Sequence, residues 1–509
     1  MKDKKMNKIL TLDEVVNKVK ALKQAGQVVV QSHGVFDLIH PGIIQHLNHA
    51  KRLGDVLIVS VIKDKDVHRG PGRPIFPEAF RVENVASLEQ VDYVCLVDNE
   101  VPFECIKMIH PDIFAKGQAA HEKDRKIHER LFQEEKEFYS DKCRIIETEG
   151  FSFSSSHIIN NFLDPYPEET KKFLNDFKGK YNFSDIADRI NALKNLKVMV
   201  IGDGIIDEYH YCESLGKSSK ANLVVSKYLS HEVFAGGTFA VANHIAGLCD
   251  NVQMVSLLGG EDSREDFITK NLKSNVKSKF FYRDDGPSVI KKRYIHEYLN
   301  QKLFEVCYMN DDFITGKLEA EVVDYLAAEV PKYDLVMVSN FGHGFITNNI
   351  IETIKTHAKI FAVNAQTNAA NVGYNLITRY DDPDYVCLDE SELRLSAQEK
   401  HTDIEQVAKK IASTVKADCL IVTLGKKGSF GVNHNSANRT PIFSHRVVDT
   451  VGAGDAFFAY TAPCYAKGMP LDMLSFIGNV AGAIAVQIVC NKKSVEKFEL
   501  LEFINTILK

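Results

Sequence analysis

Residues 449–455, D-T-V-G-A-G-D, place three small residues and an acid directly before an apolar stretch. Gly452, Ala453 and Gly454 allow a sharp turn that points successive backbone N–H groups at one spot, and the helix expected to follow adds the positive end of its dipole. Such a turn binds a phosphoryl group. Asp455 would lie beside it and accept the proton of an attacking hydroxyl group. An isolated segment of this kind is typical of a helix cap, but further motifs accompany it here and favour phosphoryl transfer.

A second group of candidate residues follows a hydrophobic strand expected at 198–202. Two acids stand at the carboxyl end of this strand, where open α/β sheets bind ligands, and a di-glycine turn further on leads into a helix-forming run. Together with the 449–455 segment, this pattern resembles the ribokinase-like (PfkB) carbohydrate kinases over about residues 180–509. The resemblance implies a catalytic base at Asp455 and a sugar-binding set made of Asp203, Asp207, Gly236, Gly237 and Asn243.

The nucleotide side of the same family is matched by two later segments. A hydrophobic strand at 420–423 runs into a T-x-G-x-x-G loop, and a helix of small residues is expected at 478–485. The resemblance implies that ATP is bound by Thr423, Gly425, Gly428 and Asn479.

Two segments depart from the family pattern. Residues 389–392, D-E-S-E, keep the glutamate that is implied to organise Mg²⁺, Glu392, but carry Asp389 where many relatives have asparagine. Residues 364–367, N-A-Q-T, replace the D-P-K type of segment that is expected in heptose kinases. The second departure leaves the sugar open, with pentose, hexose and polyol phosphates as alternatives to a heptose phosphate.

The first third of the chain carries a separate set of motifs. A β-branched strand at 27–31 runs into H-G-V-F-D-L-I-H-P-G-I, residues 33–43. This resembles the H-x-G-H signature of the cytidylyltransferase-like nucleotidyltransferases, in which two imidazoles at a helix start bind phosphates and stabilise the departing pyrophosphate. Ile43 stands at the second histidine position, and His46 is expected to be a solvated helix residue. The resemblance implies a catalytic His40 and nucleotide binding by Phe36, Asp37 and Gly42.

Further segments extend this second resemblance to about residues 25–162. They are a proline- and arginine-containing element at 70–81, a P-D-x-x-x-K-G strand end at 111–117 and the run F-S-S-S-H-I-I at 153–159. Guanidinium, ammonium and hydroxyl groups bind triphosphates, although Arg81 also suits an ordinary surface helix. The resemblance implies nucleotide binding by Arg73, Arg81, Lys116, Gly117, Ser154, Ser155 and Ser156.

Composition excludes several other classes of protein. The 509 residues are 45% hydrophobic and carry a net charge of −6 without a dense basic run, so no nucleic-acid partner is expected. No run of about 18 apolar residues predicts a membrane span. The ten cysteines occur without a C-x-x-C pair, which is typical of reduced thiols. We therefore expect a soluble cytoplasmic protein.

Strand and helix signals alternate along the whole chain, which predicts an α/β protein with parallel sheets. We expect a Rossmann-like nucleotidyltransferase domain at 1–162, a linker at 163–180 and a ribokinase-like kinase domain at 181–509. The partly β-rich segment 213–234 is expected to form a small β lid that also joins two subunits in a homodimer. An ordinary surface hairpin is the alternative.

Two such domains on one chain predict consecutive steps, in which a sugar is phosphorylated and a sugar phosphate is then joined to a nucleotide. This resembles the bifunctional ADP-heptose synthases of bacterial surface-glycan biosynthesis, with the two domains in reversed order. The resemblance implies sugar phosphate and nucleoside triphosphate substrates, ATP and Mg²⁺ at the kinase, and ATP or CTP at the N-terminal site. The alternatives are an active kinase with a nucleotide-sensing or assembly domain, and a scaffold, against which the intact 449–455 segment argues.

Overall fold

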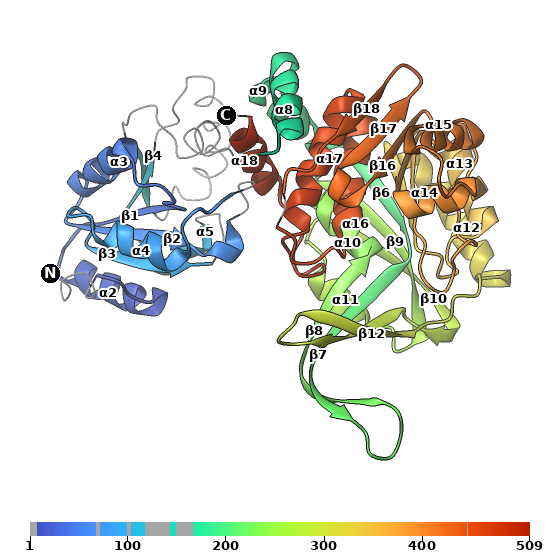
Figure 1. Cartoon of the computed structure of the whole chain (residues 1–509), viewed down its shortest axis with the longest axis horizontal. Coiled ribbons are helices and arrows are strands. Elements are labelled where there is room, and N and C mark those ends of the chain that lie inside the picture. Colours follow the sequence, from blue (N-terminus) through green and yellow to red (C-terminus); the bar gives the residue numbers. More distant parts are fainter. Residues whose placement is uncertain are drawn as a thin grey trace. The chain divides into compact units, whose positions relative to one another are not determined.

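Hydrophobic strands alternate with helices along the chain, which confirms the α/β class expected from the sequence (Figure 1). The computed structural model describes residues 8–67, 72–98, 103–117, 143–148, 166–444 and 446–508. The chain divides into two compact units, one formed by residues 1–187 with 501–509 and the other by residues 188–500. Each unit has a sheet of its own and is described by itself.

A parallel five-stranded sheet forms the centre of the first unit. Its strands in spatial order are β3 (Tyr93–Val97), β2 (Val56–Ile62), β1 (Val29–Gly34), β4 (Ile113–Gly117) and β5 (Arg144–Thr148). The chain adds β2 and β3 on one side of β1 and then returns to add β4 and β5 on the other. Open α/β sheets bind ligands at such a reversal, outside the carboxyl ends of the strands. The predicted site of this unit therefore belongs at the ends of β1 and β4.

Helices cover both faces of this sheet, and neighbouring strand residues face opposite cores because strand side chains alternate. Helices α2 (Leu12–Gln24) and α5 (Phe103–Ile109) pack with Val29 and Ile58 on one face. Helices α3 (Pro41–Arg52) and α4 (Glu78–Ala86) pack with Val30 and Leu57 on the other. Burial on both faces explains why β2 is almost continuously apolar.

The second unit is built on a nine-stranded sheet. Its spatial order is β10 (Val276–Pro287), β9 (Asn251–Glu261), β6 (Lys197–Gly202), β13 (Leu335–Asn340), β14 (Phe361–Ala365), β15 (Tyr385–Asp389), β16 (Cys419–Thr423), β17 (Ser429–Asn433) and β18 (Ala437–Thr440). The strands from β10 to β16 are parallel, and β17 and β18 are antiparallel additions. The order reverses between β6 and β13, which predicts a ligand crevice at the carboxyl ends of these two strands.

Two groups of helices cover the nine-stranded sheet. One face packs against α12 (Gly316–Glu329), α13 (Asn348–His357), α14 (Glu390–Ala397) and α15 (Ile404–Val415). The opposite face packs against α10 (Thr238–Ala246), α16 (Ala453–Ala466) and α17 (Leu471–Ala485). Helices α16 and α17 are apolar almost all round, because they lie between the sheet and the rest of this helical layer.

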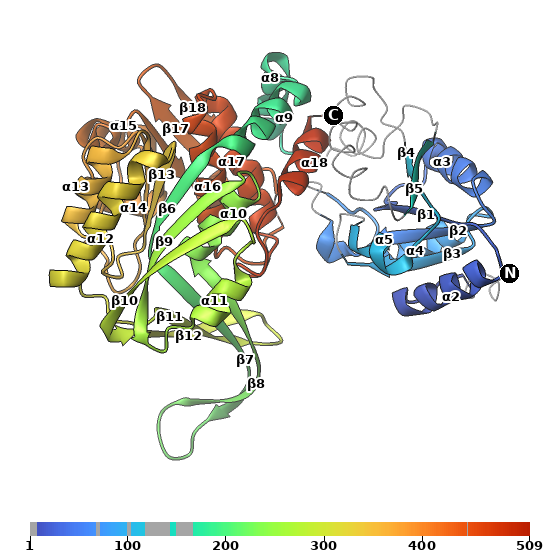
Figure 2. The same ribbon diagram turned by 180° about the vertical axis from the view of Figure 1, so that it is seen from behind.

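A smaller four-stranded sheet joins this unit, in the order β12 (Gln301–Tyr308), β11 (Ile290–His296), β7 (Gly204–Lys217) and β8 (Val224–Gly237). Strands β7 and β8 continue as a hairpin that extends well away from the nine-stranded sheet (Figure 2). This sheet is the small β element expected around 213–234. Its outer part exposes apolar side chains that include Leu215, Val224, Tyr228 and Phe304.

The remaining helices are α8 (Glu168–Lys180), α9 (Phe183–Asn191), α11 (Glu265–Asn271) and α18 (Lys497–Ile507). The described part of the segment expected to be a linker is thus mostly helical, and Leu174 and Phe177 of α8 are buried. All ten cysteines are free thiols. Within the described ranges, no helix combines the length and the apolar character that crossing a membrane requires.

Candidate active sites

The glycine-rich turn of the second unit leads directly into helix α16. Gly452 is the N-cap and has a φ of 87°, a conformation that favours glycine. Among the described residues, the backbone N–H groups of Gly454 and Asp455 have no hydrogen-bond acceptor. A Cβ added to Gly454 would meet no atom within 4 Å, so the space above the turn is open. The helix start therefore presents two unpaired N–H groups and its dipole to an anion.

Asp455 stands in the first turn of α16 and is 7% exposed. Its Oδ1 accepts a hydrogen bond of 2.7 Å from Nε2 of Gln366, which also donates to Asn364 over 2.7 Å. Burial raises the pKa of Asp455 to about 6, against the opposing effect of the Gln366 hydrogen bond. A carboxylate with a pKa near 6 is a competent general base at neutral pH. The sequence indicated the acid but not Gln366, because 364–367 stood out only as a departure from the family pattern.

The acids expected to bind sugar lie at the same edge of the sheet. Asp203 follows β6, and its Oδ2 accepts from the backbone N–H groups of Phe341 at 2.8 Å and His343 at 3.3 Å. Asp207 lies on β7 and forms an ion pair with Arg293 of β11. The charge of Asp207 also helps to raise the pKa of Asp455, although burial has the larger effect. Asp207 and Asp455 are therefore electrostatically coupled, and Asp203 lies at the same edge of the sheet.

The di-glycine turn brings β8 close to this site. A Cβ added to Gly236 would collide with the carboxylate of Asp207, and Gly237, the N-cap of α10, has a φ of 58°. Asn491, which the sequence analysis missed, lies beside both glycine turns. A Cβ on Gly452 would collide with the Asn491 side chain, and one on Gly236 would come within 3.3 Å of its Nδ2. The two glycine turns thus face one shared amide, and no sequence signal marks it.

Asp449, the first residue of the glycine-rich segment, fixes the turn rather than reacting. Its carboxylate accepts from Tyr209 and Lys302, both at 2.7 Å, and from the backbone N–H of Cys490 at 3.1 Å. Tyr209 lies on β7 and Lys302 on β12. The acid therefore ties the phosphate-binding turn to the four-stranded sheet.

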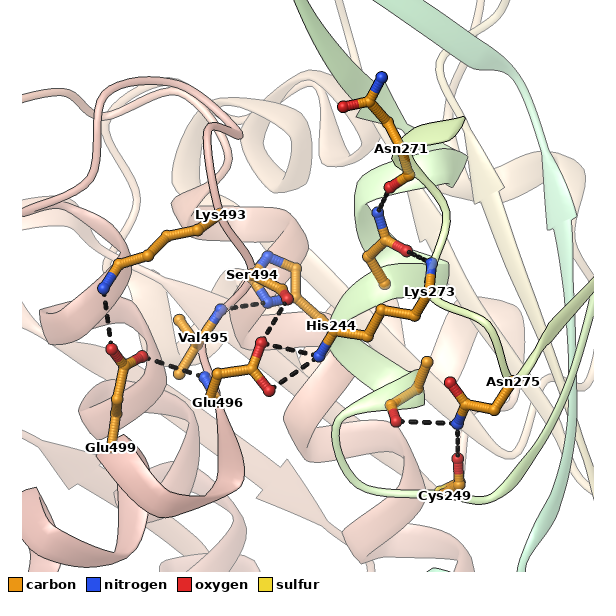
Figure 3. Close-up of polar contacts among 12 residues, drawn as sticks. His244, Cys249, Asn271, Lys273, Asn275, Lys493, Ser494, Val495, Glu496 and Glu499 are labelled. Atoms are coloured by element: carbon orange, nitrogen blue, oxygen red, sulfur yellow. Dashed lines mark hydrogen bonds and ion pairs between the residues drawn. The ribbon is translucent and has the colours of Figure 1, made fainter. Parts of the chain in front are cut away.

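Asn243 does not join this neighbourhood. Its Nδ2 donates to the carbonyl of Asn271 at 2.9 Å, and its Oδ1 accepts from the backbone N–H of Lys273 at 2.9 Å. The same cluster pairs Lys273 with Glu496 and lets His244 accept from the backbone N–H of Val495 (Figure 3). Because both polar groups of its amide are bonded to the turn after α11, we omit Asn243 from the proposed sugar site.

The Thr423–Gly428 loop contains two glycines at positions where the backbone conformation or the available space favours glycine. Gly425 and Gly428 have φ values of 56° and 83°, and a Cβ on Gly428 would collide with the carbonyl of Thr440. Thr423 ends β16 at the carboxyl edge of the sheet. Asn479 donates to Oγ of Ser429 at 2.6 Å and to the carbonyl of Ser475 at 2.7 Å, so its amide nitrogen is bound within the protein.

Glu392 closes the start of α14 as part of a capping box with Asp389. Its two oxygens accept from the backbone N–H groups of Thr367 at 3.0 Å and Asp389 at 2.8 Å. Burial, followed by the charge of Asp389, raises the pKa of Glu392 to about 8. Across the described ranges, no group of three His, Cys, Asp or Glu side chains is placed to hold a metal ion.

The candidate residues of the second unit follow successive neighbouring strands and so lie in sequence along one edge of the sheet. Asp203 follows β6, His343 follows β13 and Gln366 follows β14. Glu392 comes after β15, and the Thr423–Gly428 loop comes after β16. From the reversal point outward, this edge of the sheet therefore carries Asp203 and His343, then Gln366, then Glu392 and then the Thr423–Gly428 loop.

In the first unit, His40 is the N-cap of α3, and Pro41 begins the helix. The imidazole is 9% exposed, and its Nδ1 has no hydrogen-bond partner among the described residues. Burial lowers the pKa of His40. Phe36 has a φ of 52°, which is unusual for a large residue and is typical of tight functional turns, while Gly42 is buried in the first turn of α3.

Two predicted nucleotide-binding residues bind other parts of the protein with their polar side-chain atoms. Arg81 has no exposed surface, and its guanidinium donates to the carbonyls of Phe76, Val35 and Ile62 and to the carboxylate of Asp64. It is therefore neither a surface arginine nor able to reach a phosphate, and we omit it from the proposed site.

Asp37 is likewise committed to the protein. Its carboxylate accepts from the backbone N–H groups of Ile75 at 2.8 Å and Phe76 at 2.9 Å, which pins the 75–76 loop beside the end of β1.

His46 is not the solvated helix residue that the sequence predicted. Its Nε2 lies 2.7 Å from Oγ of Ser32, and its Nδ1 lies 2.5 Å from Oγ1 of Thr148. Burial lowers the pKa of His46 to about 4, so the ring is neutral. Thr148 in turn donates to the carbonyl of Lys116, and the Cβ position of Gly117 lies 3.8 Å from the ring. His46 thus ties α3 to the ends of β1, β4 and β5.

Of the remaining motif residues of this unit, the structure describes some and not others. Arg73 is 9% exposed and precedes a cis peptide bond to Pro74. Lys116 lies at the carboxyl end of β4, next to the reversal point of the sheet. Ser154, Ser155 and Ser156 lie outside the described residues.

Comparison with known families identifies both units. The sequence model of the pfkB family carbohydrate kinases matches residues 195–491, more than half of the chain, and the chain belongs to this family. A cytidylyltransferase-like model matches residues 32–162. The chain is therefore a fusion in which a cytidylyltransferase-like domain precedes a PfkB kinase domain.

Particular relatives are similar to this chain over parts of its length. The bifunctional protein HldE of Trichlorobacter lovleyi is 24% identical over 295 residues, 57% of this chain and 59% of that protein. The bifunctional protein HldE of Nitratiruptor sp. is 46% identical over 100 residues, 19% of this chain and 22% of that protein. The matches thus span less than two thirds of these relatives. The tetrameric inhibited form of phosphofructokinase-2 from Escherichia coli aligns with a TM-score of 0.50 at 14% identity, covering 62% of this chain and all of that one, which shows a shared fold.

Proposed function

We propose that this chain is a bifunctional enzyme that phosphorylates a sugar phosphate with ATP and transfers a nucleotidyl group to a sugar phosphate. Its product would be an ADP-heptose-like nucleotide sugar for a bacterial surface glycan. The similarity to bifunctional HldE proteins and the two family matches support this proposal. The observation that carries it is the buried Asp455 carboxylate beside two unpaired N–H groups at the start of α16.

In the kinase reaction, the N–H groups of Gly454 and Asp455 would bind the transferring γ-phosphoryl group of ATP. Asp455 would take the proton from the attacking hydroxyl group, while Gln366 holds its carboxylate in place. Asp203, Asp207 and the Gly236-Gly237 turn would position the acceptor sugar. The loop from Thr423 to Gly428 would bind the nucleotide, with Asn479 behind it.

Mg²⁺ in phosphoryl transfer is usually held by phosphates and water together with one or two carboxylates. Glu392 is the candidate carboxylate, because β15, which leads to it, lies between β14, which leads to Gln366, and β16, which leads to the Thr423–Gly428 loop. Mg²⁺ would have to replace a backbone N–H group at one of its oxygens. When bound, the ion would neutralise charge on the phosphates. A shift of the Glu392 pKa from about 8 to below neutrality on adding Mg²⁺ and ATP would test this assignment.

In the nucleotidyl transfer, His40 at the start of α3 would stabilise the charge that develops as pyrophosphate leaves ATP or CTP. Its unpartnered Nδ1 supports this role. Phe36, Gly42, Arg73, Lys116, Gly117 and Ser154–Ser156 complete the proposed nucleotide site. The sugar-phosphate oxygen would attack the α-phosphorus, with pyrophosphate as the leaving group.

Ile43 favours a second candidate function for the first unit. It stands where the family motif has a histidine, and it packs against the hydrophobic core instead of offering a hydrogen bond. The first unit would then sense nucleotide or assemble the protein while the second unit works as a kinase.

The two candidates differ in their products. Purified protein is incubated with labelled ATP or CTP and a panel of sugar phosphates, and ADP and pyrophosphate are followed separately. The bifunctional enzyme forms both products, each with its own acceptor. Formation of ADP alone would favour the sensing or assembly function, and formation of neither would contradict both.

We further propose that two copies associate through the four-stranded sheet, in the cytoplasm, where free thiols persist. Apolar side chains such as Val224, at 66% exposed, and Phe304, at 56%, are exposed on this sheet in the single chain. Light scattering should give a dimer for the wild type and a monomer for Phe304→Asp. A wild-type monomer would contradict this part of the proposal.

A further inference from the structure

A small cavity opens at the point where the strand order of the nine-stranded sheet reverses. Its lining includes Asp203 after β6, Arg283 and Ser288 near the end of β10, and His343 after β13. The cavity has a volume of about 10 Å³ and is not fully enclosed. About this volume accommodates one water-sized group. The cavity is therefore too small for a phosphate group in this conformation but large enough for one hydroxyl group.

His343 contributes two unused polar atoms to the cavity. The residue is 2% exposed, and neither ring nitrogen has a hydrogen-bond partner within the part of the chain that the structure describes. Buried polar atoms without partners destabilise a protein, so they are rare unless a ligand completes them. Burial lowers the pKa of His343 to about 3, with a smaller effect from the charge of Lys291. The ring is therefore neutral and presents one donor and one acceptor.

The backbone around His343 is held firmly beside Asp203. Gly342 and Gly344 on either side have φ values of 70° and 86°. A Cβ on Gly344 would collide with the carbonyl of Asp312. The backbone N–H of His343 donates to Asp203. These contacts fix the backbone of His343 next to an acid at the edge of the sheet.

Other polar groups of the lining are already satisfied. Arg283 pairs with Asp285, Nε to Oδ1 at 2.6 Å, and donates to the carbonyl of Asn310 at 2.5 Å. Ser288 accepts from the backbone N–H of Gly259 and donates to the carbonyl of Ser263. An anion would also lie close to the Asp203 carboxylate. A hydroxyl group, which is neutral and can either donate or accept, therefore fits one of the unused ring nitrogens best.

The cavity belongs to the same site as the proposed base. Lys291 lies on β11 and is buried. Burial raises the pKa of Asp203 and the pKa of Asp455, and the positive charge of Lys291 lowers both. The same ammonium group acts on His343. All three residues therefore lie within electrostatic range of one buried ammonium group. The cavity, which Asp203 and His343 line, thus shares this charge with the proposed base.

We propose that His343 determines acceptor specificity in the kinase by binding one hydroxyl group of the sugar, a hydroxyl other than the one that reacts. One ring nitrogen makes this bond, either by donating its N–H to the hydroxyl oxygen or by accepting the hydroxyl hydrogen. This inference rests on the proposed kinase function and adds a positioning residue to it.

The test compares the preferred acceptor with its monodeoxy analogues, using wild type and His343→Phe. One analogue should lose about 10- to 100-fold in kcat/KM with wild type, because the ring nitrogens are left unpaired. With His343→Phe, kcat/KM for the parent acceptor should fall by a similar factor. The change should lie in KM for the sugar and not in KM for ATP. For the analogue, kcat/KM should be no lower with His343→Phe than with wild type. The matched control is His434→Phe, whose histidine side chain is 71% exposed.

A thermal measurement separates ligand binding from a structural role. Without substrate, His343→Phe should unfold at a temperature at least as high as wild type, because two unsatisfied buried atoms are removed. A crystal structure of wild type with the acceptor should show a hydroxyl oxygen within hydrogen-bond distance of the His343 ring. This measurement holds even if the variant does not fold.

The outcomes are distinguishable. Phosphorylation of an acceptor by wild type together with unchanged discrimination in His343→Phe would overturn this inference and leave the kinase intact. An acceptor complex in which the cavity holds only water would do the same. Failure of every sugar phosphate to bind in calorimetry would overturn both the inference and the proposed kinase.

Discussion

The two units differ in how many polar atoms of their motif residues are bound within the protein. In the kinase unit, Asp455 receives one side-chain hydrogen bond, from Gln366, and lies beside the open space above Gly454. In the first unit, the polar atoms of Asp37 and Arg81 are bound to loop and strand backbone. His40 retains an unpartnered ring nitrogen there. The type of a motif residue thus does not by itself decide whether the residue can bind a ligand or react. Its polar atoms must also be left available by the fold.

Removing the base should have the largest effect. Asp455→Asn keeps the shape of the side chain but cannot take the hydroxyl proton, so ADP formation should fall by about 10²- to 10⁴-fold. Steady-state kinetics with the best acceptor measure this change. Asp266→Asn, an exposed acid on α11, is the matched control. Near wild-type turnover of Asp455→Asn would remove Asp455 from the role of base.

The comparison also predicts that Arg81 acts on stability rather than on binding. Arg81→Met would leave three buried carbonyls and a carboxylate without their donor, and we expect a loss of about 3–5 kcal/mol in the free energy of unfolding. Chemical denaturation measures it, with the exposed Arg52→Met as control. A variant that is as stable as wild type but binds nucleotide weakly would show that the sequence-based assignment was correct.

A pH profile tests the environment of the base. Because Asp455 must be ionised and its pKa is about 6, kcat/KM for phosphorylation should be level above pH 7. It should fall about tenfold per pH unit below 6. A profile that stays level down to pH 5 would indicate an unperturbed carboxylate.

The same shift has a consequence for stability. The folded pKa of about 6 exceeds the ordinary value of 3.8, so the ionised carboxylate destabilises the fold above pH 6, and this cost disappears as the pH falls below 4. Asp455→Asn should therefore unfold at a higher temperature than wild type at pH 7 and at a similar temperature near pH 4.

The smallest effect is expected at Ile43. Ile43→His would add a donor near the phosphates and should raise pyrophosphate formation about tenfold, partly offset by lost packing against the core. Pyrophosphate release with the same sugar phosphate measures the change. If wild type turns over rapidly and the variant is only impaired, the first unit has compensated for the missing histidine.

Much of this arrangement was predictable from the sequence because it depends on local pattern. Apolar strands at 27–31 and 198–202 predicted the sheets, and the small residues around Gly452 predicted the sharp turn before α16. Contacts between distant segments were not predictable. Gln366 reaches Asp455 across 89 positions, and Asn491 carries no motif that marks it as a neighbour of Gly452.

The errors have a common physical origin. Arg81 and Asn243 match family positions, but a side chain that reaches a backbone partner through the fold cannot be distinguished in sequence from one that faces a ligand. His46 was expected to be solvated because helical spacing places it away from the motif position. The sequence did not show that Ser32 and Thr148 would lie on either side of its ring.

The central claim is that one chain carries two separate chemistries, and a crossed assay of two variants tests it most directly. ADP and pyrophosphate are measured for wild type, Asp455→Asn and His40→Ala with their respective sugar-phosphate acceptors. We expect Asp455→Asn to lose only ADP formation, and His40→Ala to lose about 10²- to 10³-fold in pyrophosphate formation alone. Loss of both products in either variant, or pyrophosphate formation unaffected by His40→Ala, would contradict the account.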